Sequence, residues 1–201
     1  KRTAEQDQYV LHVREGFRGD GRVLVDPHEM DPDHETSVQL MEASEDGSLI
    51  AYGVREGGED EVTPRFLDVD SGEPTGETLP KGRYFGVEIT PDNEAVYYAR
   101  VVEGEGPRVF RHELGAPPEE DEVVFGSDYG RDKIVAPSLT PDGRYLFFLV
   151  FHGAGASQNE IHYLDRREGG EVRTVVEDIE ARFLPAYGDG RLYLQTNWEA
   201  P

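Results

Sequence analysis

The feature that most constrains this chain is a short motif that recurs four times at nearly equal spacing. Its shared aspartate stands at positions 46, 92, 142 and 189, so successive copies lie 46, 50 and 47 residues apart. A self-similar unit of about 40–50 residues is typical of β-propellers, in which each blade is a four-stranded antiparallel sheet. The repeat therefore predicts an all-β chain built from propeller blades.

Each copy has the composition of a tight β-hairpin turn. Three copies open with Ser or Thr, and the shared Asp is followed by Gly or Asn, as in Thr140-Pro141-Asp142-Gly143. The hydroxyl can bond nearby backbone, Pro presets its own φ, and Gly or Asn tolerates a left-handed conformation. Apolar runs such as Val135 to Leu139 and Tyr145 to Phe148 flank the turns, so each copy predicts strand, turn, strand.

Further runs with strand-like alternation lie between the turns. In total they predict sixteen strands, with no segment that keeps the three-and-four spacing of an amphipathic helix. The expected units are a half-blade over residues 1–27, full blades over 36–80, 83–126 and 133–178, and a half-blade over 181–197.

The two half-blades are complementary by this count. Residues 1–27 supply the outer two strands of a blade, and residues 181–197 supply the inner two. Joining them would complete a fourth blade, within one chain as a closed four-bladed ring or between two chains as a homodimer formed by strand exchange. Because unpaired strand edges invite pairing, we expect some such closure.

The charge balance restricts the partners. Asp and Glu total 42 against 20 Lys and Arg, a formal charge of -22, which argues against nucleic acid or an anionic membrane surface. Only three of the basic residues are Lys. Acid-rich, lysine-poor surfaces suit a high-salt habitat, and an arginine-biased genome produces the same pattern.

The absence of cysteine and of long apolar runs narrows the classes of protein to which this chain can belong. Without Cys there is neither a disulfide framework nor a Cys-based zinc site. The longest apolar run, Tyr145 to Phe151, is far shorter than the ~20 residues of a membrane helix. We expect no cofactor, and we favour the cytoplasm while the compartment stays open.

Several polar clusters are candidates for metal or phosphate sites. The densest fits neither an EF-hand loop nor a His-Glu-x-x-His helix, and we interpret it as a solvated, stiff and extended connector between blades. Its members are Asp26, His28, Glu29, Asp31, Asp33, His34 and Glu35. We interpret Glu119 to Glu122 as an exposed charge run. Gly104-Glu105-Gly106 is interpreted as a hairpin turn. Three histidines lie within predicted strands, and we interpret them as packing or rim residues: His12, His112 and His162.

The order of motifs along the chain carries a family resemblance. A hairpin ends in Val25-Asp26-Pro27, three Ser/Thr-x-Asp turns follow, and Thr196-Asn197 precedes Ala200-Pro201. This order resembles the first half or so of the β-propeller of the prolyl oligopeptidase family of serine peptidases. The resemblance implies a seven-bladed propeller that caps an α/β-hydrolase domain and admits only short peptides to the catalytic serine.

The resemblance also implies positions near the substrate. An aromatic residue in the first strand of a blade matches Tyr84 or Phe85. The family also has an arginine at the end of a second strand. The matching stretch of this chain has Phe151 followed by His152, so the polar contact with the substrate that the arginine implies is in doubt. Tyr84, Phe85, Phe151 and His152 are the candidate substrate-facing residues. Packing between blades is the simpler explanation of Tyr84 and Phe151.

No catalytic residue is expected in this chain. The nearest string to a nucleophile elbow, Gly155-Ala156-Ser157-Gln158-Asn159, lacks the final Gly and lies in a predicted hairpin loop. The chain begins Lys1-Arg2 without Met, as a fragment would. The implied function is a non-catalytic, substrate-gating propeller whose partners are the hydrolase domain and short peptides. The alternative is a TolB-like propeller that binds a protein or ligand and has no hydrolase domain.

Overall fold

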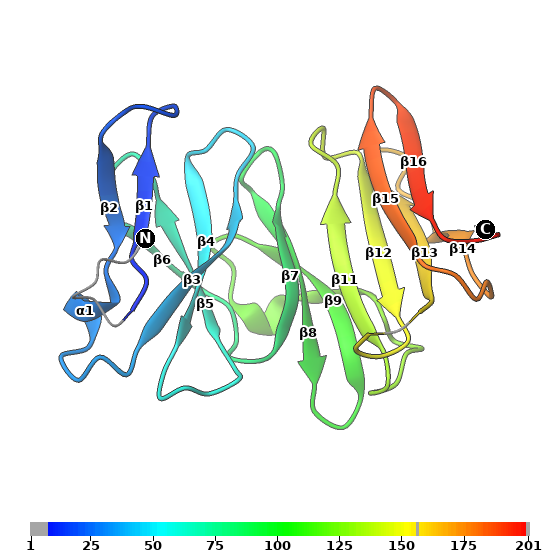
Figure 1. Ribbon diagram of the computed structural model, residues 1–201, viewed down its shortest axis with the longest axis horizontal. Coiled ribbons are helices and arrows are strands. Elements are labelled where there is room, and N and C mark those ends of the chain that lie inside the picture. Colours follow the sequence, from blue (N-terminus) through cyan, green and yellow to red (C-terminus); the bar gives the residue numbers. More distant parts are fainter. Residues whose placement is uncertain (1–7, 156, 200–201) are drawn as a thin grey trace.

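The computed structural model describes residues 8–155 and 157–199, and it confirms the all-β propeller fold (Figure 1). Consecutive antiparallel strands form three four-stranded sheets and two two-stranded ones. The two pairs are β1 (Leu11–Arg14) with β2 (Gly21–Val25), and β15 (Phe183–Gly188) with β16 (Arg191–Thr196).

The three full blades follow one another along the chain. The first comprises β3 (Ser37–Ala43), β4 (Leu49–Arg55), β5 (Thr63–Asp68) and β6 (Pro74–Thr78). The second comprises β7 (Tyr84–Ile89), β8 (Ala95–Val102), β9 (Gly106–Glu113) and β10 (Glu122–Phe125). The third comprises β11 (Ile134–Leu139), β12 (Tyr145–Phe151), β13 (Asn159–Asp165) and β14 (Arg173–Val176).

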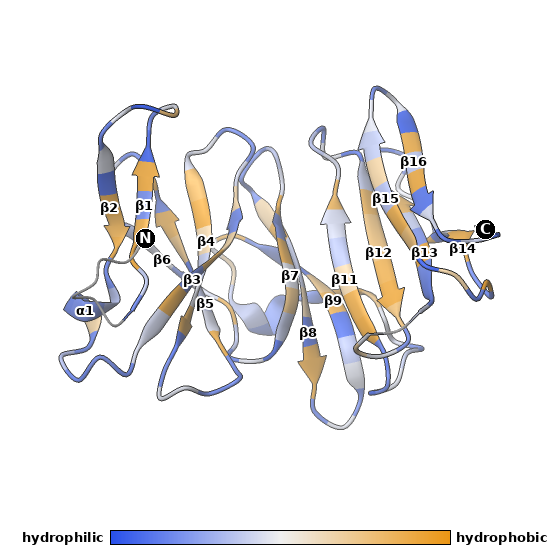
Figure 2. Ribbon diagram, viewed as in Figure 1, coloured by the Kyte–Doolittle hydropathy of each residue, from blue (hydrophilic) through white to orange (hydrophobic). Residues whose placement is uncertain are grey.

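The first strands of the blades form the inner edge of the assembly. β3, β7 and β11 are each an edge strand of their own sheet, and β7 contacts both of the others. The sheets stand in a row, and the last strands of the blades lie away from this inner edge (Figure 1). Hydrophobic residues concentrate in the strands and hydrophilic ones in the loops (Figure 2).

Closure into a four-bladed ring within one chain does not occur, so that expectation was wrong. β1–β2 and β15–β16 are separate two-stranded sheets, and they lie at opposite ends of the row (Figure 1). The three full blades pack against one another through filled apolar layers. Because close-packed side chains set the angle between neighbouring sheets, the row keeps an open arc.

The connector after β2 is not extended throughout, which corrects a second expectation. Pro27–Met30 in this connector form a single helical turn, α1. A second short turn, of 3₁₀ type, lies elsewhere, at Pro118–Glu120 before β10. Asp26 is the N-cap of α1: its carboxylate accepts the amide of His28 at 3.0 Å, and proline occupies the first helical position. This cap and proline pairing is a helix-start signal, and it prevails locally over the extended tendency of the loop.

The core lies between the sheets. Between the first and second blades, Phe66 and Leu79 belong to one buried cluster with Tyr98 and Phe110, whose rings stack 5.2 Å apart. Between the second and third blades, the rings of Phe125 and Phe148 stack at 4.2 Å. No helix among the described residues is long and apolar enough to cross a membrane.

The repeated turns have the chemistry that the sequence predicts. In the third blade the Thr140 hydroxyl donates to the Asp142 carboxylate at 2.6 Å, and the same carboxylate oxygen accepts the amide of Arg144 at 3.1 Å. The Thr140 hydroxyl also accepts the amide of Tyr145 at 3.0 Å. These bonds recur at Ser44/Asp46 and Thr90/Asp92.

The fourth turn differs because Tyr187 stands where the other copies have Ser or Thr. Gly188 and Arg191 pair directly, and both residues between them take left-handed conformations, Asp189 at φ 50° and Gly190 at φ 71°. The aspartate itself adopts a left-handed conformation here, whereas in the other copies only the Gly or Asn does so.

Removing the turn carboxylate should weaken the fold. We expect Asp142→Ala to lower the free energy of unfolding by about 1 kcal/mol, because two hydrogen bonds to an exposed turn are lost. The bonds from Thr140 and Arg144 lower the pKa of Asp142, so its stabilisation is present above the ordinary Asp range and is lost as pH falls through the lowered value.

Urea unfolding at pH 6 and pH 3 measures both effects. Asp142→Asn, which keeps the shape of the side chain, should lose less stability between these pH values than the unchanged protein. An equal loss in the two proteins would contradict the role of the charge.

Added salt should stabilise the chain. At a formal charge of -22 the folded state repels itself, and ions screen that repulsion over a Debye length of ~10 Å at 0.1 M. We expect the melting temperature to rise between 0.05 and 1 M NaCl. A weakly interacting salt is the control for general effects of salt on burial, and a flat or falling melting temperature would contradict the prediction.

Candidate functional site

The four candidate residues lie at the same end of the blades. Tyr84 and Phe85 begin a first strand, and Phe151 and His152 end or follow a second strand. First strands begin where second strands end, as the pairing of Ile134 with Phe151 shows. This end, which we call the loop end, lies opposite the aspartate turns and at the lower edge of Figure 1.

Tyr84 is tied into the interface with the first blade. Its ring lies 5.6 Å from that of Tyr98, and its hydroxyl donates to the carbonyl of Pro80. Burial raises the pKa of Tyr84 well above its ordinary value. Its hydroxyl therefore has a structural partner, which agrees with the packing explanation.

Phe85 faces the opposite way and packs against the cluster between the second and third blades. The strand register shifts here, because Tyr84 pairs with Arg100 and Gly86 with Ala99, which leaves Phe85 as an extra, bulged residue. A β-bulge re-aims a side chain and is common beside binding sites. The bulge thus places the two adjacent aromatic residues in two different interfaces.

Phe151 and His152 differ in their surroundings. Phe151 is a half-buried member of the sheet, between Ile134 and Asn159 in the strand register. His152 follows it, and its two ring nitrogens are engaged: Nδ1 lies 2.8 Å from the Gln158 amide nitrogen and Nε2 2.6 Å from Glu160. Since the amide donates to Nδ1, the neutral ring carries its proton on Nε2 and donates it to the carboxylate.

Glu160 is the hub of this polar network. The Tyr129 hydroxyl donates to its Oε2 at 2.5 Å, and His162 Nε2 lies 3.2 Å from the same oxygen. Burial alone would raise the pKa of Glu160, but the bonds from Tyr129, His152 and His162 hold it below its ordinary value. The carboxylate therefore stays charged and orients the three side chains around it.

Glu160 and Tyr129 are not among the site residues predicted from the sequence. The alternation Glu160-Ile161-His162-Tyr163 contained a usable signal, because residues two apart share one face of a strand. No local signal points to Tyr129, which comes from the loop between β10 and β11. Arg108 holds this loop, since its buried guanidinium donates to the carbonyls of Gly126 at 2.7 Å and Tyr129 at 3.0 Å.

In the acidic cluster after β2, the carboxylates of Asp26 and Asp31 are engaged by backbone amides of the chain itself. The Asp31 carboxylate accepts the amides of Asp33, Glu35 and Thr36 at 3.0, 2.8 and 2.9 Å, and Asp26 caps α1. Within residues 8–155 and 157–199, no group of three or more His, Asp or Glu is arranged to hold a metal ion.

The remaining candidates have structural surroundings. His112 is fully buried, with Nδ1 2.6 Å from Asp121, and His162 Nδ1 lies 3.1 Å from the Thr174 hydroxyl. The turn at Gly104-Glu105-Gly106 joins β8 to β9, where the Glu105 amide donates to the carbonyl of Val102 at 3.1 Å.

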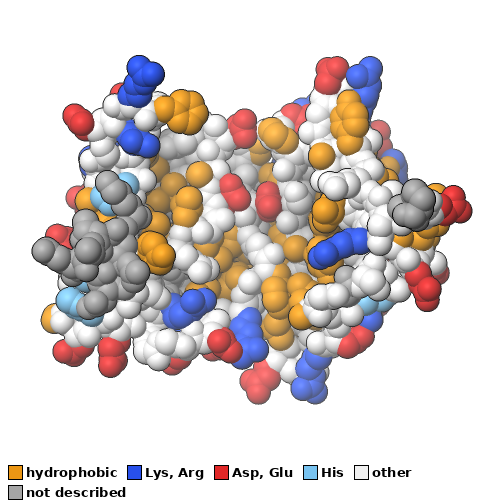
Figure 3. Space-filling view, in the orientation of Figure 1, with side chains coloured by type: hydrophobic (Ala, Val, Ile, Leu, Met, Phe, Trp, Pro, Cys, Tyr) orange, Lys and Arg blue, Asp and Glu red, His pale blue; other side chains and the backbone are white. Residues whose placement is uncertain are grey.

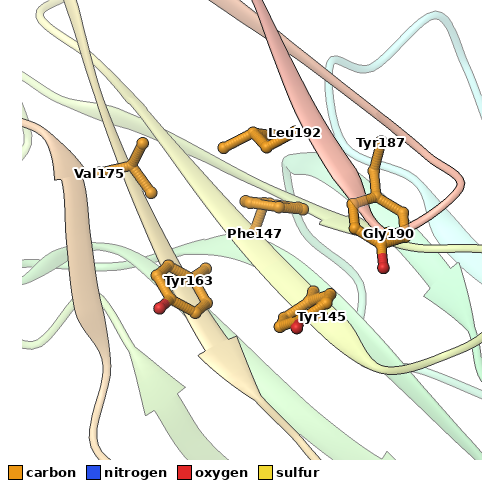
Figure 4. A pocket seen from close by; sticks show the side chains of 7 residues that line it. All are labelled: Tyr145, Phe147, Tyr163, Val175, Tyr187, Gly190 and Leu192. Atoms are coloured by element: carbon orange, nitrogen blue, oxygen red, sulfur yellow. The ribbon is translucent and has the colours of Figure 1, made fainter.

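An aromatic pocket of about 230 Å³ lies between the third blade and β15–β16 (Figure 4). The Tyr145 ring meets those of Tyr187 at 5.3 Å and Tyr163 at 5.9 Å, both edge to face. Between the full blades a third-strand side chain such as Phe110 fills the corresponding layer. The last sheet has two strands, so its layer is incomplete. The lining residues are Tyr145, Phe147, Tyr163, Val175, Tyr187, Gly190 and Leu192.

Removing the charge of Glu160 should destabilise the loop end. We expect Glu160→Gln to lower the free energy of unfolding by about 1.5–3 kcal/mol, because charge-assisted bonds from Tyr129 and His152 are lost in a buried setting. Glu168→Gln, which breaks only an exposed pair with Arg173, should cost less than about 1 kcal/mol. Denaturant unfolding compares them, and equal losses would contradict the role of Glu160 as a hub.

Comparison with known proteins gives a consistent family. Residues 1–201 match the family described as the prolyl oligopeptidase N-terminal beta-propeller domain. A prolyl endopeptidase of Elizabethkingia meningoseptica is 28% identical over 212 residues, which cover 100% of this chain and 30% of that protein. Prolyl oligopeptidase A of Galerina marginata (strain CBS 339.88) is 26% identical over 166 residues, covering 70% of this chain and 22% of that protein.

Solved structures agree with the sequence match. A structure from a structural and mechanistic study of two prolyl endopeptidases superposes with a TM-score of 0.84 at 26% identity, covering 94% of this chain and 29% of that chain. The ligand-free prolyl oligopeptidase B from Galerina marginata, at 22% identity and a TM-score of 0.75, supports the fold alone. The chain spans about 30% of the length of the curated relatives that match all of it. Because the family match covers every residue and the sheets superpose on a solved prolyl endopeptidase, this chain belongs to the prolyl oligopeptidase N-terminal β-propeller domain family.

Proposed function

We propose that the chain is the substrate-gating propeller portion of a prolyl oligopeptidase-like serine peptidase and is non-catalytic by itself. The observation that carries the proposal is the superposition of its sheets on a prolyl endopeptidase at a TM-score of 0.84. Its partners are an α/β-hydrolase domain and short peptide substrates. The propeller restricts access by size, because its blades are held rigidly by filled apolar layers.

The loop end is the face that meets the peptide. Phe85 and Phe151 are half-buried and apolar, and His152 is held in place by Glu160 and Gln158. These side chains offer a peptide an apolar surface beside an ordered imidazole. Since Phe151 replaces an arginine of the family pattern, the contact with the substrate at this position is dispersive instead of charge-assisted. Tyr84 supports this surface from the interface behind it.

Strand exchange between two copies belongs to the same proposal. β1–β2 and β15–β16 are two-stranded sheets, and β15–β16 exposes Leu184, Tyr193 and Leu194. Unpaired strand edges of this kind can pair with the complementary strands of another molecule, so two copies of this chain can complete each other's half-blades.

The chain alone should hydrolyse no proline-containing chromogenic peptide and should take up no active-serine probe. The reason is that the elbow-like string around Ser157 lacks the final Gly and the chain contains no Gly-x-Ser-x-Gly sequence. Mass spectrometry after labelling is the measurement, with a complete prolyl endopeptidase as the positive control. Specific labelling of a serine in this chain would overturn the non-catalytic assignment.

The coding sequence downstream of Pro201 tests the gating role directly. We expect further propeller blades followed by a Gly-x-Ser-x-Gly elbow in a strand-turn-helix context. A reading frame without a hydrolase domain would overturn the gating role and favour a binding propeller.

A further inference from the structure

Two glutamates occupy equivalent positions on neighbouring inner strands. Glu42 on β3 and Glu88 on β7 each stand four residues before the aspartate of their turn, and Ser138 holds this position on β11. Acidic side chains lie in the hollow at the middle of the face in Figure 3. Neither the turn chemistry nor the gating role requires a carboxylate at these positions.

Glu88 joins two blades. Its Oε2 accepts the backbone amide of Leu139 at 3.0 Å, and this amide belongs to the inner edge strand of the third blade. Edge amides that face away from their own sheet need a partner from elsewhere. The carboxyl group of Glu88 therefore closes the inner seam between the second and third blades.

The surroundings of Glu88 disfavour its charge. Burial raises the pKa of Glu88 to about 7, the Leu139 bond opposes this rise, and the carboxylate of Glu42 adds to it. Glu88 is half-buried, and a partly desolvated carboxylate without a cation beside it is costly; a like charge increases the cost.

Within residues 8–155 and 157–199, no cation acts on the carboxyl group of Glu88 to offset the cost of its charge. Tyr97 on β8 stands opposite Glu88 in the strand register, and the guanidinium of Arg166 donates to the Tyr97 hydroxyl at 3.1 Å. Arg166 also donates to the carbonyl of Gly143. The described strand Ile134–Leu139 contains no titratable residue, so Glu42 is the ionisable group that acts on Glu88 from a neighbouring blade.

We propose that Glu88 is a proton-operated latch on the inner seam between the second and third blades. The neutral carboxyl group stays in the seam and accepts the Leu139 amide. The ionised group loses stability in that place and is repelled by Glu42, so it turns out toward the hollow and releases the amide. The seam is tight in mildly acidic solution and looser in mildly alkaline solution.

The direction follows from the titration of an acid whose pKa is raised. Below the ordinary glutamate range the carboxyl group of Glu88 is protonated in both the closed and the open seam, so pH has no effect on the latch. Between that range and pH about 7, Glu88 is ionised in the open seam and still protonated in the closed seam. Opening therefore becomes about tenfold more frequent per pH unit. Above about 7 both states are ionised, and the effect levels off.

Amide hydrogen exchange at Leu139 and carbon NMR of the Glu88 carboxyl group, recorded from pH 5 to 8.5, test the latch. After correction for the intrinsic pH dependence of exchange, we expect the protection of Leu139 to fall with pH and to level off at the midpoint at which Glu88 titrates. Glu88→Gln should make the corrected protection independent of pH. Glu122→Gln, on an exposed position of β10, is the matched control and should behave as the unchanged protein.

Glu42→Gln gives a second test that keeps the seam intact. Removing its charge should shift the Glu88 midpoint and the exchange midpoint downward together. A Glu88 midpoint in the ordinary glutamate range, or Leu139 protection that falls equally with pH in Glu88→Gln, would overturn the proposal. An unchanged midpoint in Glu42→Gln would overturn the coupling between the two glutamates.

Discussion

Face-to-face packing between sheets is the interaction on which the rest of this structure depends. The large buried side chains, such as Phe66, Tyr98 and Phe148, belong to clusters that span two neighbouring sheets. A blade therefore has no complete core of its own and needs a neighbour on each face, as in other repeat architectures. The same requirement explains why Leu184 and Tyr193 are exposed on β15–β16, where the last sheet has only two strands.

Polar contacts determine how the packed sheets are aligned. At the turn end, the Asn93 amide donates to both carboxylate oxygens of Asp46 at 3.2 Å, which links the turns of the first two blades. At the inner edge Glu88 reaches the third blade, and at the loop end Tyr129 reaches Glu160. Apolar layers supply most of the stabilisation because they bury the area, whereas directional bonds select one alignment among several of similar burial.

This division between apolar packing and polar alignment bears on the proposed gating function. Two of the four candidate substrate-facing residues are also interface residues: Tyr84 packs toward the first blade and Phe85 toward the third. A change in the contact between blades would therefore move the surface that we propose as the one that meets a peptide. The carboxyl group of Glu88 lies on one of these seams, so the proton concentration acts on the same element that positions the loop end.

The sequence by itself determined what depends on near neighbours along the chain. Strand alternation and the Ser/Thr-x-Asp turns are local, so the all-β class, the hairpins and the blade repeat could be predicted. The cap signal of Asp26 before Pro27 is local too, but the interpretation of this loop as extended did not use it. Tertiary structure alone decided that Tyr129 meets Glu160 and that Leu139 meets Glu88, because these partners lie 31 and 51 residues apart in the chain. It also decided that the half-blades stay apart, because the angle between sheets arises from the combined volume of side chains that meet only after folding.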